Sequence, residues 1–242
     1  MAREQPKQAP PPVQRLRVRY AKRGRLRFTS HRDFSRAFER AVFRARLPMA
    51  YSSGFNPHPR ISYAGAAPTG AASEAEYLEL ALAEVVDPAA VHALLDEAMP
   101  DGLDVVEVVE SPGGSLADLL QASRWTIEVQ VPLRAAQQAV RAFLAADQVP
   151  VQRMTKKGLR EFDSRAAVLA LEAQPDTADS EERSELDLVL RHLEPAVRPD
   201  DVLSGLASVG GLELTAVPLL TREVQGPLDE ETGEIGDPLH PR

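Results

Sequence analysis

The changing hydrophobic period along this chain is the feature that most constrains its fold. Residues 16–20 alternate apolar and polar side chains, which predicts a half-buried strand. The alternation resumes at Leu26 and Phe28 after a turn at Gly24, which predicts a second extended segment. From Ser30, a predicted N-cap, apolar residues instead recur every three or four positions. We therefore expect extended chain that leads directly into an amphipathic helix.

The following segments complete one folding unit. Residues 61–64 and 77–82 are predicted strands. A helix is predicted from Asp87, its N-cap, to Met99. Residues 103–109 are the last predicted strand. The order β-α-β-β-α-β is that of a ferredoxin-like unit.

A similar order of elements is expected a second time, from the strand pattern at 125–131 and the helix pattern at 133–146. Two strands, 151–155 and 159–171, are predicted around a Lys-Lys-Gly turn. The remaining predicted elements are a strand, a helix and a strand, at 186–190, 199–209 and 212–220. The sequence thus predicts an α+β fold of tandem ferredoxin-like units, with antiparallel sheets and helices on one face of each.

Composition predicts the boundaries of these units. Residues 1–14 are rich in Pro and residues 224–242 are acidic, so both are expected to be disordered tails. The two units are expected at 15–112 and 124–223. The segment between them, 113–123, begins with two glycines and is the predicted linker.

Basic residues are concentrated near the N-terminus. The first sixty residues hold 15 Lys or Arg and 3 Asp or Glu, a balance of +12, whereas the other 182 hold 13 basic and 33 acidic residues, a balance of −20. A basic block in a chain of formal charge −8 indicates a negatively charged partner. Phosphates of RNA or DNA fit, because arginine binds them bidentately. Pairing with the acidic second half, or with a protein, is the alternative.

Composition also excludes several classes of function. The chain has no Cys, which excludes thiolate metal sites, iron–sulfur ligation and Cys nucleophiles. It has no apolar run near the roughly 20 residues needed to span a bilayer, and a cytoplasmic protein is expected. It has no Walker loop, GxGxxG or GxSxG motif, so a nucleotide-dependent enzyme is not indicated.

Arginines at every fourth position predict a ridge along the first helix. Basic residues before the helix, and at the turn in the second unit, are expected to extend that positive surface. The predicted anion-binding residues are Arg23, Arg25, Arg32, Arg36, Arg40, Arg44, Lys156 and Lys157.

His31 is the candidate catalytic residue. It lies where extended chain meets the first helix, a position from which it could act as a general base or bind a phosphate. Together with His58, and with Asp33 or Glu76, it would supply enough ligands for a metal. The spacing matches no metal motif, so no metal is expected.

The loop after the first helix is the candidate recognition element. Prolines on both sides of His58 restrict its backbone, and Gly54 permits unusual conformations. Such a rigid polar loop indicates contact with a ligand, although a well-made connection explains it equally well. The predicted recognition residues are Ser30, His31, Asn56, His58, Arg60, Glu76, Asp163 and Arg165.

Two acidic residues of this set are expected to lie near arginines. Glu76 is expected to pair with Arg60 or another arginine of the basic block. Asp163 and Arg165 are two positions apart, so they are expected on one face of the same strand.

The stretch from Arg27 to Leu80 resembles a known family. Its sequence, RFTSHRDFSRAFERAVFRARLPMAYSSGFNPHPRISYAGAAPTGAASEAEYLEL, is similar to the signature of the radical-SAM-linked (radical SAM-associated) proteins, a domain of unknown function. The later segment KKGLREFDSR resembles another part of that pattern. The resemblance covers about residues 15–222.

Members of that family occur beside radical SAM proteins or fused to them. The resemblance therefore implies a radical SAM protein as partner, which would hold the Fe–S cluster and SAM, and no cofactor in this chain. It assigns no catalytic residue.

We therefore expect a non-catalytic accessory protein that binds or presents an anionic substrate, above all RNA, to a radical SAM enzyme. Two alternatives are open: a metal-independent endoribonuclease that uses His31, and a pure protein-interaction scaffold. At fold level, the predicted tandem units also resemble the CRISPR repeat-processing endoribonucleases, which bind RNA on a positive surface.

Overall fold

The computed structural model describes residues 8–155, 158–176 and 182–241. Lys156, Lys157 and the first seven residues of the predicted N-terminal tail lie outside this part of the chain. The chain divides into two compact units. Unit 1 contains the residues up to Leu119 together with those from Leu239 onward, and unit 2 runs from Leu120 to Pro238.

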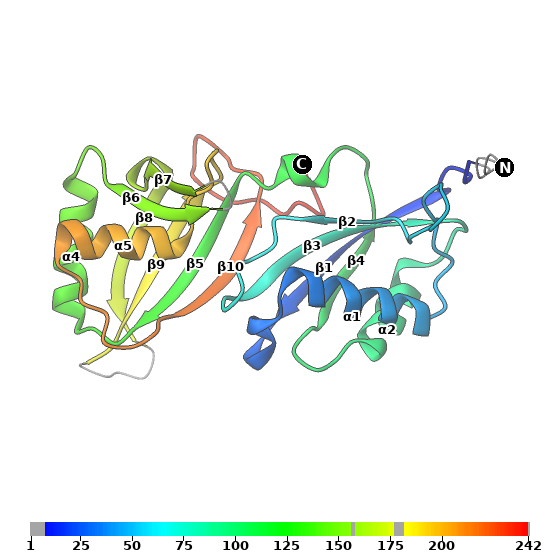
Figure 1. The fold of residues 1–242 in the computed structure, drawn as a ribbon, viewed down its shortest axis with the longest axis horizontal. Helices are drawn as coiled ribbons and strands as arrows, with labels where there is room; N and C mark the ends of the chain where they lie inside the picture. The colour runs from blue at the N-terminus through cyan, green and yellow to red at the C-terminus, as the bar shows by residue number, and fades with distance from the viewer. Residues whose placement is uncertain (1–7, 156–157, 177–181, 242) are drawn as a thin grey trace. The chain divides into compact units, whose positions relative to one another are not determined.

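Unit 1 is an antiparallel sheet with two main helices (Figure 1). Its elements are β1 (Gln14–Lys22), the 3-10 helix η1 (Gly24–Phe28), α1 (His31–Arg44), β2 (Ile61–Ala64), β3 (Ala72–Leu82), α2 (Pro88–Ala98), β4 (Val105–Glu110) and the short α3 (Leu116–Leu119). Strand β1 pairs with β3 and β4, and β2 pairs with β3. The predicted order of strands and main helices in this unit is confirmed.

The prediction of an extended segment at Leu26 and Phe28 is wrong. Gly24 has a φ of 53°, which turns the chain as it leaves β1. Backbone bonds from Leu26 to Arg23 and from Thr29 to Leu26 then close a 3-10 helix. The side chains from 24 to 28 therefore spiral instead of alternating.

The core of unit 1 explains why α1 begins and packs as it does. Its predicted cap is confirmed, because the Ser30 Oγ accepts the N–H of Asp33 at 3.2 Å. The buried face of α1 packs against the sheet and α2. The helical members of this core are Phe34, Phe38, Ala41, Val42, Val91 and Leu95, and they meet Leu16, Val18, Leu78 and Leu80 of the strands. Burying this face directs the rest of α1 to solvent.

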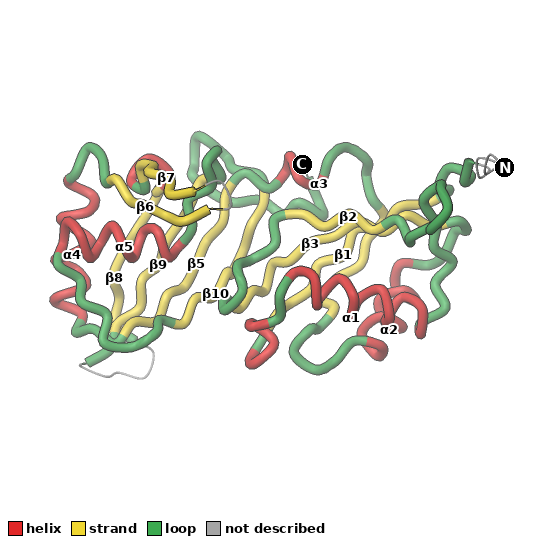
Figure 2. The backbone as a smooth tube through the Cα atoms, in the orientation of Figure 1, coloured by secondary structure: helices red, strands yellow, loops and turns green. Residues whose placement is uncertain are grey.

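Unit 2 has antiparallel strands, helices and an added hairpin (Figure 2). Its elements are β5 (Ala122–Val129), α4 (Leu133–Ala145), β6 (Pro150–Thr155), β7 (Gly158–Asp163), the 3-10 helix η2 (Arg165–Ala167), β8 (Val168–Pro175), β9 (Ser184–Arg191), α5 (Pro199–Gly210) and β10 (Leu219–Gly226). Strand β5 pairs with β9 and β10, and β8 pairs with β9. Strands β6 and β7 pair only with each other.

Two strand predictions in unit 2 are wrong. The expected strand 159–171 is two strands separated at Ser164, whose buried Oγ donates to the Val149 carbonyl at 2.9 Å. The expected strand 212–220 begins only at Leu219. Gly211, with a φ of 68°, ends α5 in the left-handed conformation, and residues 212–218 connect it to β10 without pairing as a strand.

The result is a mixed α/β fold with antiparallel strand pairing in both units. Within the predicted acidic tail, β10 extends to Gly226, and Leu228 then forms a bridge with Ile235. None of the helices in the described ranges is both long and apolar enough to cross a membrane.

Candidate nucleic-acid interface

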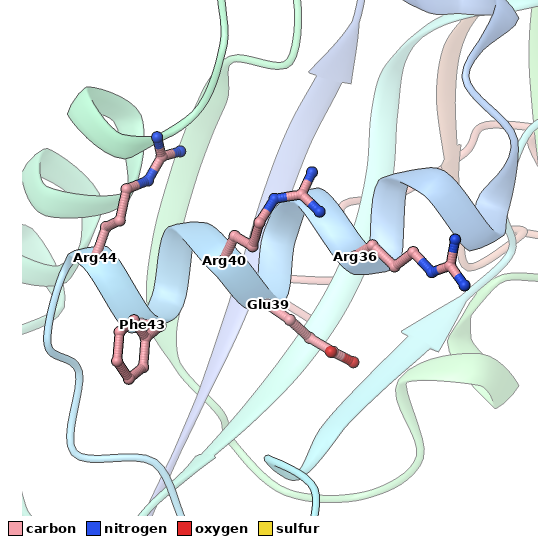
Figure 3. A pocket seen from close by; sticks show the side chains of 5 residues that line it. All are labelled: Arg36, Glu39, Arg40, Phe43 and Arg44. Carbon is pink, nitrogen blue, oxygen red and sulfur yellow. The ribbon is translucent and has the colours of Figure 1, made fainter.

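The exposed side of α1 carries the predicted arginine row, which consists of Arg32, Arg36, Arg40 and Arg44. All four are exposed, because the opposite face of α1, which includes Phe34 and Phe38, is buried in the core. In Figure 3, Arg40 and Arg44 project to one side of the helix while Glu39 and Phe43 project to the other. A row spaced by four residues, about 6 Å of rise per step, offers repeated positive charge along the helix.

The arginine row is largely free of internal partners. Among the described residues, Arg32, Arg36 and Arg40 form no ion pair. The Arg44 guanidinium donates to the carbonyl of Ala98, the last residue of α2. A guanidinium has five N–H donors, so Arg44 keeps several for a ligand. The row can therefore bind an anion without breaking an internal salt bridge.

Arg36, Arg40 and Arg44 line an open hollow of about 610 Å³ together with Glu39 and Phe43 (Figure 3). We call it the arginine hollow. The Phe43 side chain is 81% exposed. Sequence reasoning did not single out this residue. The available signal was its position, because Phe43 lies among the arginines and outside the buried stripe of α1.

A second hollow of about 610 Å³ adjoins the first, since both are lined by Glu39 and Phe43. We call it the apolar hollow. It lies between the end of α1 and the segment that follows, and its other lining residues are Val42, Arg46, Leu47, Met49, Tyr51 and Pro59. Sequence reasoning had given Tyr51 no role.

The backbone at Arg46 is unusual. Arg46 has a φ of 52°, and among the described residues it is the one non-glycine with positive φ. Bonds from Arg46 N–H to the Phe43 carbonyl and from Leu47 N–H to the Val42 carbonyl form the Schellman arrangement that ends α1. Glycine is the usual residue at this position, because it adopts the left-handed conformation without a steric penalty.

The predicted recognition loop has a well-fixed base. Tyr51 and Pro59 form a β-bridge. Inside it, the Ser52 N–H donates to the His58 carbonyl at 2.9 Å and the His58 N–H donates to the Ser52 Oγ at 3.0 Å. Asn56 and His58 are exposed. The half-buried Arg60 instead continues into the sheet, where its N–H donates to the carbonyl of residue 50 at 2.8 Å.

His31 is exposed in the first turn of α1, and its ring packs edge-on against Tyr63 of β2, with centroids 5.0 Å apart. Burial raises the pKa of Tyr63 to about 12, and the Glu39 carboxylate acts in the same direction. The Tyr63 hydroxyl therefore remains protonated near neutral pH. The Ser30 hydroxyl is used by the helix cap, where it donates to Asp33 Oδ2 at 2.7 Å.

Arg23 and Arg25 differ from each other. Arg23 donates to both carboxylate oxygens of Glu74, at 2.8 and 2.5 Å, and to Asp104 Oδ2 at 2.7 Å. Its hydrogen bonds with Glu74 raise the pKa of Arg23, and Asp104 contributes as well. Arg25 is exposed on η1. The guanidinium of Arg23 thus ties η1 to β3 and the start of β4, whereas Arg25 faces solvent.

The carboxylates of the two remaining acidic residues, Glu76 and Asp163, accept hydrogen bonds from backbone N–H groups. The buried Glu76 accepts the Ala67 N–H, at 3.1 and 3.3 Å, and holds the loop before β3. Asp163 and Arg165 do not share a strand face, because Arg165 lies in η2. Asp163 Oδ1 accepts the N–H groups of Val149 at 2.8 Å and Arg165 at 3.0 Å, which closes the base of the β6–β7 hairpin.

Comparison with known proteins gives a family without an assigned activity. A family model described as "Uncharacterized protein conserved in bacteria (DUF2344)" matches residues 15–199, which is more than half of the chain. The chain has 13% identity to a solved structure titled "Crystal Structure of an Unknown Protein from Galdieria sulphuraria". That likeness covers 86% of this chain and 98% of the other, with a TM-score of 0.24. No curated protein matches the chain.

Proposed function

From the surface of this chain, which belongs to the DUF2344 family of uncharacterized bacterial proteins, we propose that it is a non-catalytic RNA-binding accessory protein. The arginine row of α1 contacts the phosphates. One observation carries this proposal: Arg32, Arg36 and Arg40 form no ion pair with a described residue, although the chain has 36 acidic residues. Exposed like charges held in a row repel one another, and a polyanion relieves that repulsion.

The chemistry beside the row favours RNA over a small anion. Phe43 is strongly exposed next to the arginines. Aromatic rings beside a positive groove bind nucleic acids by stacking on bases while the cations contact phosphates. The exposed Asn56 and His58 of the nearby sequence add hydrogen-bonding groups that are able to read base edges.

We propose a radical SAM enzyme as the partner to which the RNA is presented. This part of the proposal rests on the resemblance of the Arg27–Leu80 stretch and of the KKGLREFDSR segment. The Fe–S cluster and SAM would belong to that partner, since this chain has no Cys to hold a cluster. A cytoplasmic location follows from such a role.

We also propose that each unit is a ferredoxin-like unit. In support, β1 lies between β3 and β4 with β2 beside β3, and β5 lies between β9 and β10 with β8 beside β9. The order of elements is also the same once the β6–β7 hairpin is treated as an insertion. Unit 1 then serves as the RNA-binding unit.

The test is RNA affinity measured at a series of salt concentrations. Wild-type affinity should fall steeply with salt. The Arg36→Gln/Arg40→Gln variant should bind more weakly, and the magnitude of its log–log salt slope should be smaller by about 1.4, which is about 0.7 for each single-strand phosphate contact. Arg15→Gln is the control, because that arginine pairs with Glu79 at 2.8 Å. Equal binding by all three proteins would overturn the proposal.

The same material tests the two alternatives. RNA recovered intact after incubation supports an accessory role, whereas cleavage that disappears in His31→Ala would replace it with an endoribonuclease. The scaffold alternative has a different signature. In that case Arg36→Glu/Arg40→Glu would lose co-purification with the radical SAM protein and leave RNA binding unchanged.

A further inference from the structure

We infer that the apolar hollow takes an unpaired base, so that the ligand of this chain is single-stranded or looped RNA and not a continuous duplex. The inference rests on the proposed RNA-binding function and specifies its substrate class. It depends on the two sides of α1, on the lining of the hollow and on the backbone at Arg46.

The two sides of α1 divide the chemistry of a nucleotide. Arg40 and Arg44 project to one side, and Glu39 and Phe43 to the other (Figure 3). A phosphate is attracted to the first side and repelled by the Glu39 carboxylate on the second. A base carries no charge, so it can approach Phe43 and stack on its ring. A strand that follows the arginine row therefore turns its bases toward Phe43.

The apolar hollow has the lining that such a base needs. Met49 is buried, whereas Tyr51 is 46% exposed and Phe43 is 81% exposed. The flat faces of a base can contact these apolar and aromatic groups, while Glu39 and Arg46 offer an acceptor and donors for its edge. In a duplex the bases are stacked inside the helix, so they cannot enter a hollow of this kind without being extruded.

Arg46 gives an independent reason to assign a ligand here. Its backbone conformation, with a φ of 52°, favours glycine, and ending α1 requires only backbone groups. The Arg46 side chain is exposed and lines the apolar hollow. A non-glycine residue in a backbone conformation that favours glycine points to a use for its side chain, and a positive charge beside a base-binding hollow suits a neighbouring phosphate or a base edge.

The first experiment compares RNA oligonucleotides of equal length, one single-stranded and one fully duplex, with the full chain. Wild type should prefer the single strand by about tenfold or more. Phe43→Ala should lower single-strand affinity by roughly fivefold or more, as expected for the loss of one stacked base, and should leave duplex affinity nearly unchanged. Phe28→Ala is the matched control, because Phe28 is 58% exposed but lines neither hollow. Thermal unfolding of each variant checks that it folds.

The second experiment uses Arg46→Gly. The thermal midpoint of this variant should be equal to or above that of wild type, since glycine relieves the left-handed backbone. Its affinity for single-stranded RNA should fall. A residue that serves only the helix end would instead give unchanged RNA binding.

These outcomes separate the inference from the proposed function. Equal affinity of wild type for single strand and duplex, or equal effects of Phe43→Ala and Phe28→Ala, would overturn the inference. A salt-dependent loss of binding in Arg36→Gln/Arg40→Gln would still support the proposed function. If no RNA binds at low salt, both fail. If Phe43→Ala releases a protein partner and leaves RNA binding intact, the hollow is a protein-docking surface and the inference is wrong.

Discussion

The arginines of β1 and those of α1 belong to one basic block in the sequence, yet their surroundings in unit 1 are opposite. On β1, Arg15 and Arg17 pair with Glu79 of β3, and Arg19 pairs with Glu107 of β4. On α1, the acidic Asp33 is engaged by the Ser30 cap, and the arginine row remains exposed. A strand acquires neighbours on both sides through sheet pairing, whereas the outer face of a helix meets only solvent. The same residue type thus builds the fold in one element and stays available in the next.

Arg17 shows how far the strand arginines are committed to the fold. Its side chain is fully buried. The Arg17 Nη2 donates to the Gly113 carbonyl at 2.7 Å and to the Gly114 carbonyl at 3.3 Å. The Arg17 Nε lies 3.5 Å from a Glu79 carboxylate oxygen. The Ser111 hydroxyl donates to the same Glu79 oxygen at 2.8 Å. Burial of this charge is tolerated because several acceptors surround it.

Replacing a buried strand arginine should have the largest effect. Arg17→Met leaves Glu79 without its buried partner, and we expect a loss of about 3 kcal/mol or more in the free energy of unfolding. Arg36→Met, the exposed counterpart on α1, should cost less than about 0.5 kcal/mol. Urea unfolding of both variants measures the difference. Similar losses would mean that the two sets of arginines are not distinct.

The comparison is sharpened by Arg23, which was predicted to bind anions but pairs with Glu74 and Asp104. Arg36→Gln should reduce the magnitude of the log–log salt slope of RNA binding by about 0.7, which corresponds to one phosphate contact. Arg23→Gln should leave that slope unchanged, because its guanidinium is already neutralised. Titrations with one single-stranded oligonucleotide at stepped salt suffice. A smaller slope in Arg23→Gln would show that ion pairing does not withdraw an arginine from binding.

A smaller, pH-dependent effect should appear in unit 2, at a histidine whose two ring nitrogens both have hydrogen-bond partners. His192 Nδ1 lies 2.7 Å from the Leu120 carbonyl, so it carries the proton, and Nε2 can accept from the Ser123 hydroxyl at 3.0 Å. Partial loss of solvent around the hydrogen-bonded ring lowers the pKa of His192 below its ordinary value of 6.5, and nearby Arg222 acts in the same direction. His192 is therefore neutral above pH 6.5, whereas the buried Arg17 of β1 is charged and is paired with Glu79.

The sign of the pH effect follows from this lowered pKa. The unfolded chain binds a proton at His192 before the folded chain does, so the stability contributed above pH 6.5 is lost as pH falls through the folded-state pKa. His192→Gln should reduce the difference in unfolding free energy between pH values above and below 6.5. Urea unfolding at both pH values measures it. An unchanged difference in the variant would assign the pH dependence to other groups.

The sequence was sufficient to predict where α1 lies, but not which residues pair with the arginines beside it. The 3.6-residue period, the Ser30 cap and the spacing of the arginine row are local, so α1 and its arginine row could be located in advance. The pairing of Arg23 depends on Glu74 and Asp104, which strand register brings together from far along the chain. The break at Ser164 had the same cause, because it depends on a tertiary bond to Val149.

The role of Phe43 was also hidden, for a different reason. A phenylalanine is normally assigned to the core, and only the phase of the helix shows that this one faces solvent. The late start of β10 has a comparable origin, since apolar residues after Gly211 fit a strand pattern but do not pair. Residue type alone therefore predicts the wrong surroundings for Phe43 and the wrong start for β10.

The left-handed backbone at Arg46 also predicts which residues relatives of the chain have at this position. Where a relative has no use for a charge beside the apolar hollow, mutation to glycine is favoured, because glycine ends the helix without strain. Where position 46 is basic and position 43 is aromatic, we expect the relative to use the hollow. We therefore expect the pair of identities at 43 and 46 to separate relatives that retain this surface from relatives that have lost it.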